Sequence, residues 1–390
     1  MNRMLKESNA KRILGLAMIL VGISCGLAQL ARGAASKNAA PQASVVVQTD
    51  AGGMPRVENA KLETRAVSGS LDSTMRELAE KADKPEWVGY GVDQIAGDRG
   101  VCCGNYNGDG NCGTCRLETE HNENGGTTTV PGTLKLEGPR QLVVLFRLEA
   151  RKVMRIRIAS ENCTLDAGGL PFVWLTGVKP AESVSFLESF VRESDFASRG
   201  DHGIGHGALT AIALHADPSA DRAFESFVKP DQPEELRRQA AFWLGAARGQ
   251  SGFAILRQIS KTDPSSDVRA HVAFALSVSH ESGAIEEMIR MAHDDSSSHV
   301  RGQALFWLAQ KAGNKAVSTI SGAIENDPDT DVKKKAVFAL SQLPKDEGVP
   351  KLIEVAQTNR NPEVRKQAMF WLGQSNDPRV LAFFEQVLSK

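Results

Sequence analysis

The chain has 390 residues, of which 41% are hydrophobic and 24% are charged, and its formal net charge is −1. This length allows two domains with ample cores, and the composition is ordinary for a soluble globular protein. Acidic and basic residues are mixed along the sequence, without the basic stripe that follows a phosphate backbone. We therefore expect no nucleic acid partner.

The first 35 residues have the pattern of an export signal. Basic residues precede an apolar run over residues 13–27, and small residues follow at 33–35, where a signal peptidase could cut. An uncleaved membrane anchor is the alternative, because the apolar stretch nearly reaches the length that spans a bilayer. Cys25 also lies in a segment that resembles a lipoprotein cleavage box, although Gly22 stands where leucine is usual. We predict an exported protein of the periplasm or cell envelope, which contacts the membrane only if residues 1–35 are retained.

The next two segments differ in pattern. Residues 36–70 are rich in Ala, Gln, Val, Ser and Gly with little periodicity, which predicts a flexible linker. In residues 71–178 a short helix is followed by extended segments, of which 141–148 and 153–158 would pair as a hairpin. We therefore predict a small β-rich domain over residues 71–178.

Five cysteines follow the export segment, and in an exported chain they predict disulfide bonds. They are Cys102, Cys103, Cys112, Cys115 and Cys163. Five is an odd number, so one thiol stays free or pairs between chains, and the connectivity is open. Cys112-Gly-Thr-Cys115 has the spacing of one zinc knuckle or of a redox pair. The adjacent Cys102-Cys103 has poor geometry for a second knuckle, and a redox pair belongs at the start of a helix rather than in a Gly-rich loop.

The same loop resembles the first half of a calcium site. Asn105, Asn107 and Asp109 place oxygen atoms at alternate positions, and Gly110 stands at the sixth. The twelfth position, where a bidentate Glu belongs, is Arg116, which also replaces the His that a c-type haem motif needs. We interpret the segment as a turn-forming loop.

Three histidines in the second half of the chain are candidate metal ligands. His202 and His206 have an i, i+4 spacing, but two glycines between them disfavour a rigid metal-binding helix. We expect these two and His215 to be loop histidines. The sequence thus predicts no metal and no cofactor.

The last third of the chain contains one ten-residue phrase five times. A fixed period of 20–50 residues is typical of a solenoid, in which each unit buries its apolar face against its neighbours. Apolar residues recur at helical offsets within each copy, so each copy predicts an amphipathic helix, and a second helix follows it. The copies begin at Leu236, Val268, Val300, Val332 and Val364, each 32 residues after the one before.

The turns between repeats carry a second pattern. Asp263-Pro264, Asp327-Pro328 and Asn361-Pro362 predict helix starts, with Asp or Asn as the N-cap and Pro at the first helical position. A basic residue stands just after the first Val of four copies, and we expect it to form ion pairs with the Asp-rich turns. These residues are Arg269, Arg301, Lys333 and Arg365.

One position of the repeated helix alternates between large and small residues. Trp243, Trp307 and Trp371 occupy it in three copies, and Ala275 and Ala339 in the other two. Large side chains packed against small ones let helices interdigitate, so we interpret this position as the repeat core. The alternative is an exposed aromatic ladder that grips a peptide or a sugar.

A phenylalanine precedes that position in every copy, about 100° round the helix. We expect these side chains to pack between repeats, and they are the stripe that would serve for binding if any aromatic stripe is exposed. They are Phe242, Phe274, Phe306, Phe338 and Phe370.

The turn Asp, followed by Val-Arg and an Ala-Leu helix, resembles HEAT repeats of the short type named after the phycobilisome lyases, over about residues 180–390. The resemblance implies a right-handed α-solenoid of helix pairs and no particular activity. The region from Trp87 to Cys102-Cys103, with Cys163-Thr-Leu-Asp-Ala-Gly-Gly, looks like the N-terminal part of exported bacterial HEAT-repeat proteins. The fold class is therefore α+β, with the small β-rich domain before the solenoid.

We predict a non-catalytic scaffold whose solenoid holds a protein or peptide partner, because the sequence has no nucleophile–base or metal constellation. The alternative is an enzyme, either a lyase-like protein that attaches bilins or a thiol–disulfide catalyst that uses Cys112 and Cys115. True lyases attach bilins in the cytoplasm, which conflicts with export. A HEAT-like DNA glycosylase is disfavoured by the export signal and by the lack of a basic groove.

Overall fold

The structure, a computed structural model, describes residues 54–96, 100–102, 105–107, 114–119, 140–193, 196 and 203–389. The predicted export segment and the first part of the predicted linker lie outside the described residues. The chain divides into two compact units, Met1–Gln48 and Thr49–Lys390, and every described residue belongs to the second. None of the helices in the described ranges is long and apolar enough to cross a membrane.

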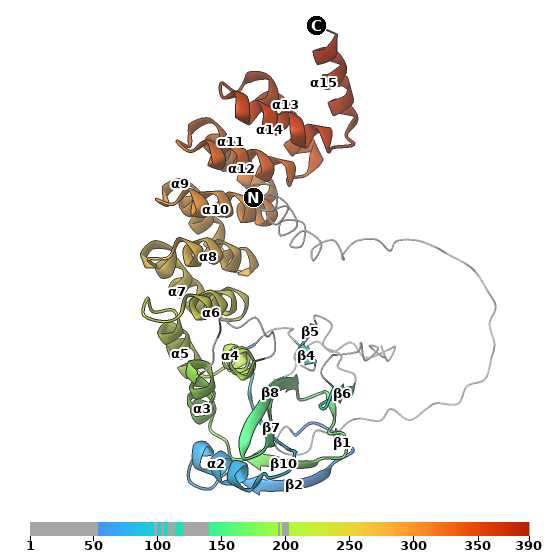
Figure 1. The fold of residues 1–390 in the computed structure, drawn as a ribbon, viewed down its shortest axis with the longest axis vertical. Coiled ribbons are helices and arrows are strands. Elements are labelled where there is room, and N and C mark those ends of the chain that lie inside the picture. Colours follow the sequence, from blue (N-terminus) through green and yellow to red (C-terminus); the bar gives the residue numbers. More distant parts are fainter. Residues whose placement is uncertain are drawn as a thin grey trace, which may run out of the picture. The chain divides into compact units, whose positions relative to one another are not determined.

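A five-stranded sheet forms the N-terminal part of this unit (Figure 1). Its strand order is β2-β10-β3-β7-β8, in which β10 runs parallel to both of its neighbours and β3, β7 and β8 are antiparallel. The strands are β2 (Lys61–Ala66), β3 (Glu86–Asp93), β7 (Gln141–Glu149), β8 (Lys152–Ser160) and β10 (Pro171–Thr176).

Shorter elements surround this sheet. Helix α2 (Leu71–Lys81) begins after the N-cap Ser70, whose side chain accepts a hydrogen bond from the backbone of Ser73. A three-stranded parallel sheet has the order β1-β9-β6, and a separate hairpin pairs β4 with β5. These strands are β1 (Val57–Glu58), β4 (Gly100–Cys102), β5 (Asn105–Asn107), β6 (Thr114–Arg116) and β9 (Thr164–Asp166).

The predicted hairpin of residues 141–158 is confirmed as β7 and β8. Their connection places Ala150 and Arg151 at φ values of 50° and 63°. Two successive residues with positive φ match the right-handed twist of the strands, as in a type I′ turn. The turn forms although neither residue is the Gly or Asn that this conformation favours.

The flexible linker predicted for residues 36–70 is wrong for its last part. Residues 57–66 form β1 and β2, and β2 pairs along its whole length with β10. Most side chains of β2 are exposed because it is an edge strand, so it lacks the alternating apolar pattern that announces a strand. The strand conformation of β2 is therefore determined by backbone hydrogen bonds to β10, which is distant in the sequence.

The two faces of the five-stranded sheet belong to different cores. Tyr90, Val144 and Phe146 lie in the same apolar cluster as the helices that follow the sheet. Trp87 and Leu145 point to a smaller cluster that also contains β6 and β9 residues. The boundary predicted at residues 178–180 therefore does not separate two cores, because one face of the sheet packs on the first helices.

Thirteen helices, α3–α15, follow in the described part of the chain and form the predicted α-solenoid (Figure 1). Each copy of the repeated phrase lies in a helix of its own, and we call these five the copy helices. Successive copy helices contact one another, and the helices between them pack alongside. The copy helices are α6 (Glu234–Ala247), α8 (Ser266–Val278), α10 (Ser298–Ala312), α12 (Thr330–Ser341) and α14 (Pro362–Gly373). The others are α3 (Pro180–Glu193), α4 (Ile204–Leu214), α5 (Ser219–Phe227), α7 (Gly249–Thr262), α9 (Ala284–Asp294), α11 (Val317–Asn326), α13 (Lys345–Thr358) and α15 (Pro378–Leu388).

Two of the three predicted helix starts are in the wrong register. Asn361 is the N-cap of α14 with Pro362 at its first position, as expected. Asp263 and Asp327 instead end the helices before, and the N-caps are Ser265 and Asp329. In both turns the Asp lies two residues before the N-cap, and its carboxylate accepts a hydrogen bond from the backbone N–H of that N-cap. The N···O distance is 2.8 Å from Ser265 to Asp263 and 2.9 Å from Asp329 to Asp327.

Candidate functional site

The aromatic residues of the copy helices form one continuous row. Phe242 stacks on Phe274 with ring centroids 5.8 Å apart and planes 16° apart, and Phe306 stacks on Phe338 at 5.7 Å and 5°. Phe274 and Phe338 each also contact the tryptophan of the next copy helix, at 4.7 Å in both cases. We call this row the aromatic ladder. Its members are Phe242, Trp243, Phe274, Phe306, Trp307, Phe338, Phe370 and Trp371.

The alternation of tryptophan and alanine explains how the row becomes continuous. Ala275 and Ala339 are fully buried between copy helices. Because alanine fills little space, the phenylalanine beside each of them reaches the tryptophan of the following helix. The three tryptophans themselves are half-buried at the edge of the core. The position is thus core in the alanine copies and partly surface in the tryptophan copies.

The ladder is accessible to solvent along its length. Phe370 is 54% exposed, and the phenylalanines of the other four copy helices are half-buried. An aromatic pair contributes about 0.5–1.5 kcal/mol beyond the area that it buries, so these contacts hold neighbouring repeats together. A continuous apolar surface that stays partly exposed is also a place where a partner can bind.

Polar side chains stand one helical turn before the ladder. Gln239, Gln303 and Gln367 precede the three tryptophans by four residues. The side chain of Lys335 in α12 packs over Gly302 in α10, so closely that a Cβ atom on Gly302 would overlap it. His271 contacts Phe274 at 5.4 Å, and burial lowers its pKa to about 4, helped by the nearby charge of Arg238.

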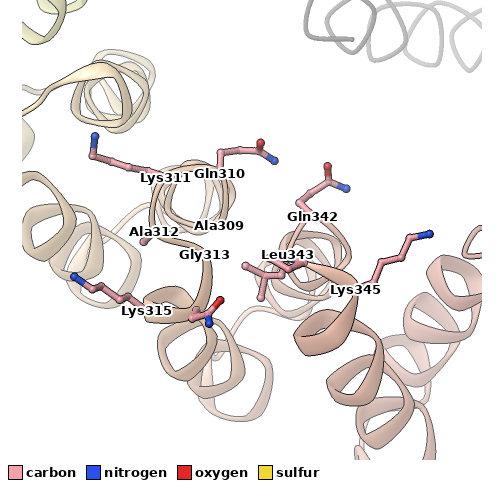
Figure 2. Close-up of a pocket in the computed structure, with 11 residues that line it drawn as sticks. Ala309, Gln310, Lys311, Ala312, Gly313, Lys315, Gln342, Leu343 and Lys345 are labelled. Atoms are coloured by element: carbon pink, nitrogen blue, oxygen red, sulfur yellow. The ribbon is translucent and has the colours of Figure 1, made fainter. Parts of the chain in front are cut away.

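A groove of about 770 Å³ lies one turn beyond the ladder (Figure 2). It is formed by the ends of α10 and α12 and by the turns that follow them. Its lining residues are Ala309, Gln310, Lys311, Ala312, Gly313, Asn314, Lys315, Gln342, Leu343, Pro344 and Lys345, which include three lysines and no carboxylate. The groove could not be predicted from the repeat pattern, although lysine and amide residues just after two of the copies are a visible signal.

The three lysines differ in their roles. Lys311 donates to the backbone oxygen atoms of Ser277 and Ser279, so it stabilises the C-terminal end of α8. Burial lowers the pKa of Lys311. Lys315 and Lys345 are exposed at the rim of the groove.

Buried ion pairs fix the register of the repeats. Arg269 pairs with Asp295 at 2.9 Å, and Arg301 pairs with Asp327 at 2.7 Å, as predicted. Arg237, which the sequence analysis missed because its copy begins with Leu rather than Val, pairs with Asp263 in the same way. These charges are removed from water, so breaking one pair leaves a partner that is costly to bury.

The two other predicted pairs are wrong. Lys333 donates to the backbone oxygen of Glu325, and Arg365 donates to the backbone oxygen of Asn359. The junction residue that is Asp in the earlier repeats is Asn359 here, so it offers Lys333 no charge.

A buried chain of hydrogen bonds links the sheet to the first helices. Tyr90 of β3 lies 2.7 Å from the hydroxyl of Ser183 in α3, which lies 2.8 Å from Nε2 of His215. Nδ1 of His215 lies 2.7 Å from the backbone oxygen of Ala211, to which it donates, so Nε2 accepts from Ser183. Burial lowers the pKa of His215 to about 4, because the charged form would be desolvated.

This Ser–His contact is not an exposed catalytic pair. Ser183 and His215 are both fully buried, and the hydroxyl is engaged by Tyr90 on its other side. The prediction that His215 is a loop histidine is wrong, since it caps α4 inside the core. The prediction is also wrong for His206, which lies within α4 against Phe196 at 4.9 Å, and His202 is outside the described residues.

The cysteine region is described only in part. Cys115 and Cys163 are buried, each 1% exposed, and their sulfur atoms are disulfide-bonded. Cys102 lies in β4, while Cys103 and Cys112 are outside the described residues, so the connectivity stays open. Asn105 and Asn107 belong to strand β5 rather than to a turn. Across the described ranges, no three His, Cys, Asp or Glu side chains group in a way that could hold a metal ion.

Comparison with known proteins identifies the repeats. A family model described as HEAT repeats matches residues 222–309 and 317–390. This part of the solenoid consists of HEAT repeats. No curated protein matches the sequence.

Solved structures that are similar to part of this chain include three proteins of different kinds. Human deoxyhypusine hydroxylase is 18% identical, with 53% of this chain and 77% of that chain covered and a TM-score of 0.24. YibA of E. coli is 23% identical, with 53% and 80% covered and a TM-score of 0.33. The complex of CpcE and CpcF of phycocyanin lyase from Nostoc sp. PCC7120 is 18% identical, with 50% and 76% covered and a TM-score of 0.28. These likenesses concern the fold alone.

Proposed function

We propose that the protein is a binding scaffold whose HEAT solenoid holds a protein or peptide partner on the aromatic ladder. The observation that carries the proposal is the continuity of the ladder across five copy helices while its side chains stay partly exposed. Side chains that serve packing alone are fully buried, as Ala275 and Ala339 are at the same helix position as the tryptophans. Exposed aromatic groups in a row are instead the type of side chain that dominates protein interfaces.

The ion pairs at the junctions support the same function. Arg237, Arg269 and Arg301 each join a copy helix to the turn that precedes the next one. They hold successive ladder residues at a fixed spacing before any partner arrives. A surface that is already ordered binds with a smaller loss of conformational entropy.

Export to the periplasm or cell envelope is part of the proposal. The pattern of residues 1–35 supports it, and so do the disulfide-bonded Cys115 and Cys163, because disulfides persist in oxidising compartments. A fusion of residues 1–70 to alkaline phosphatase, which is active only after export, tests it. Activity equal to that of a fusion lacking residues 1–35 would overturn it.

The geometry of Cys115 disfavours the thiol–disulfide catalyst. A redox thiol needs solvent access and an environment that stabilises the thiolate, such as a helix start. Cys115 lies in strand β6 and is 1% exposed. No described residue favours the bilin lyase.

Photo-crosslinking in the native cell tests the scaffold function. A benzophenone amino acid is placed at Phe370, which is 54% exposed on the ladder, and in separate controls at Leu381 and Met154, which are 64% and 50% exposed elsewhere. We expect one defined protein to be crosslinked from position 370 and not from the two control positions. Equal crosslinking from all three positions, or none from position 370, would overturn the proposal.

A further inference from the structure

The lysine-lined groove continues the aromatic ladder. On α10, Gln310 and Lys311 stand four residues after Phe306 and Trp307, and Gln342, the C-cap of α12, stands four residues after Phe338. Side chains four residues apart are neighbours on one face of a helix. A chain that lies along the ladder at these two helices therefore reaches the groove without leaving the same face.

The groove is positively charged and has no acidic lining. The side chains of Lys315 and Lys345 form no ion pair or hydrogen bond within the described part of the chain. The pKa of Asp377 is lowered chiefly by its hydrogen bond with Arg379, and only to a lesser extent by Lys345, so this carboxylate is already engaged by the arginine. The groove thus offers two ammonium groups to an anionic partner.

The lysines do not converge on one point. Figure 2 shows Lys311, Lys315 and Lys345 extending in different directions around the groove. A single small anion would need donors that point at one centre. Separate carboxylates spaced along a chain match this arrangement better.

The opposite border of the ladder provides groups that suit a peptide backbone. Gln303 and Gln367 form no hydrogen bond within the described ranges. A carboxamide both donates and accepts, so it can bond the N–H and C=O of an extended peptide. Lys335 and Lys366, beside them, likewise lack an ion pair among the described residues.

A continuous polyanion fits this surface less well than a peptide does. Four copy helices carry a carboxylate in their first turn, one turn before Gln239, His271, Lys335 and Gln367 respectively, and these carboxylates would repel an unbroken phosphate backbone. A peptide with intermittent acidic residues avoids them. The carboxylates belong to Glu235, Asp267, Asp331 and Glu363.

We infer that the segment held by the solenoid is an extended acidic peptide, whose apolar side chains cover the aromatic ladder and whose carboxylates bind Lys315 and Lys345 in the groove. This inference rests on the proposed scaffold function and adds the chemistry of the partner.

Selection from a phage-displayed library of random twelve-residue peptides against the full chain tests the inference. We expect enrichment of peptides that combine Asp or Glu with apolar residues. The binding variant is Lys315→Glu/Lys345→Glu, and the matched control is Lys61→Glu/Lys152→Glu, which makes the same charge change at exposed positions of the sheet. Lys311 is left intact because it stabilises α8.

The enriched peptides should bind the groove variant about tenfold more weakly at physiological salt and bind the sheet variant unchanged, because only the groove charges meet the peptide. Replacing the peptide's acidic residues with lysine should restore binding to the groove variant. Equal binding to both variants, or selection of peptides without acidic residues, would overturn the inference while leaving the scaffold function intact. Tighter binding of a single-stranded oligothymidylate than of any selected peptide would also overturn it.

Discussion

Arg301 in α10 and Asp327 at the end of α11 form a two-point ion pair, with Nε to Oδ2 at 2.7 Å and Nη2 to Oδ1 at 2.9 Å. Arg301 also donates from Nη1 to the backbone oxygen of Asp295, at 2.9 Å. One buried guanidinium therefore joins the turn before its own helix to the turn before the next. The same contact recurs 32 residues earlier, between Arg269 and Asp295, so the ion pairs follow the repeat period of the sequence.

Replacing this arginine should cost more stability than replacing its counterpart in the last repeat. Arg301→Ala leaves the Asp327 carboxylate buried without its partner, which costs about 3–5 kcal/mol. Arg365→Ala removes hydrogen bonds to backbone oxygen atoms only, which costs about 1 kcal/mol. Urea unfolding of the two variants measures the difference. Equal losses would mean that the ion pair does not set the register.

The buried histidine predicts a dependence of stability on pH. The pKa of His215 is about 4 in the folded chain, against about 6.5 when unfolded. Between these values the unfolded chain binds a proton that the folded chain does not, so stability falls as the pH falls from 6.5 toward 4. The loss assigned to this group is on the order of 3 kcal/mol.

The measurement is the free energy of unfolding at pH 7, 6 and 5 for the wild type and for His215→Gln. The variant is less stable at pH 7 but should lose less stability on acidification, because it lacks the titrating group. The same pH slope in both proteins would contradict the assignment.

Two glycines at the same repeat position should respond in opposite ways. A Cβ on Gly245 of α6 would overlap the backbone oxygen of Ala275 in α8, whereas nothing lies within 4 Å of the Cβ position at Gly373. Gly245→Ala should therefore destabilise the chain by about 1–3 kcal/mol, since the two helices must separate. Gly373→Ala should leave stability unchanged or raise it by up to about 1 kcal/mol. The melting temperatures of the two variants measure the difference. Equal changes in both variants would contradict the close approach of α6 and α8 as the cause.

The HEAT solenoid could be predicted because its information is local and repeated. The phrase that begins at Val300 places Val300, Ala304 and Leu308 on one helical face, and all three are fully buried. The 32-residue spacing then stacks that face on its neighbours. The hairpin of β7 and β8 followed from alternation in the same way.

What the sequence did not reveal depends on contacts between distant residues. Tyr90, Ser183 and His215 meet only after the sheet packs on α3 and α4, so no spacing announces them. Edge strand β2 is held by the backbone of β10, 105 or more residues later, and its own side chains carry little pattern. The groove arises where two turns come together, one from each of two repeats.

The sequence predicts the residues of the ladder but not how far they are exposed. Packing is the prediction for the tryptophan and phenylalanine positions, and an exposed aromatic stripe is the alternative. Their partial exposure depends on how the copy helices pack, with Ala275 and Ala339 fully buried and the aromatic side chains beside them only half-buried.

The proposed binding of a partner on the aromatic ladder is tested by the affinity of the crosslinked partner for two single-site variants. Phe370→Ser removes an exposed ladder residue, and Leu381→Ser removes an equally apolar residue outside it that is 64% exposed. We expect Phe370→Ser to weaken binding about tenfold or more, as for an aromatic interface anchor, and Leu381→Ser to leave it within about twofold. Equal affinities of the two variants, or a greater loss for Leu381→Ser, would contradict the account.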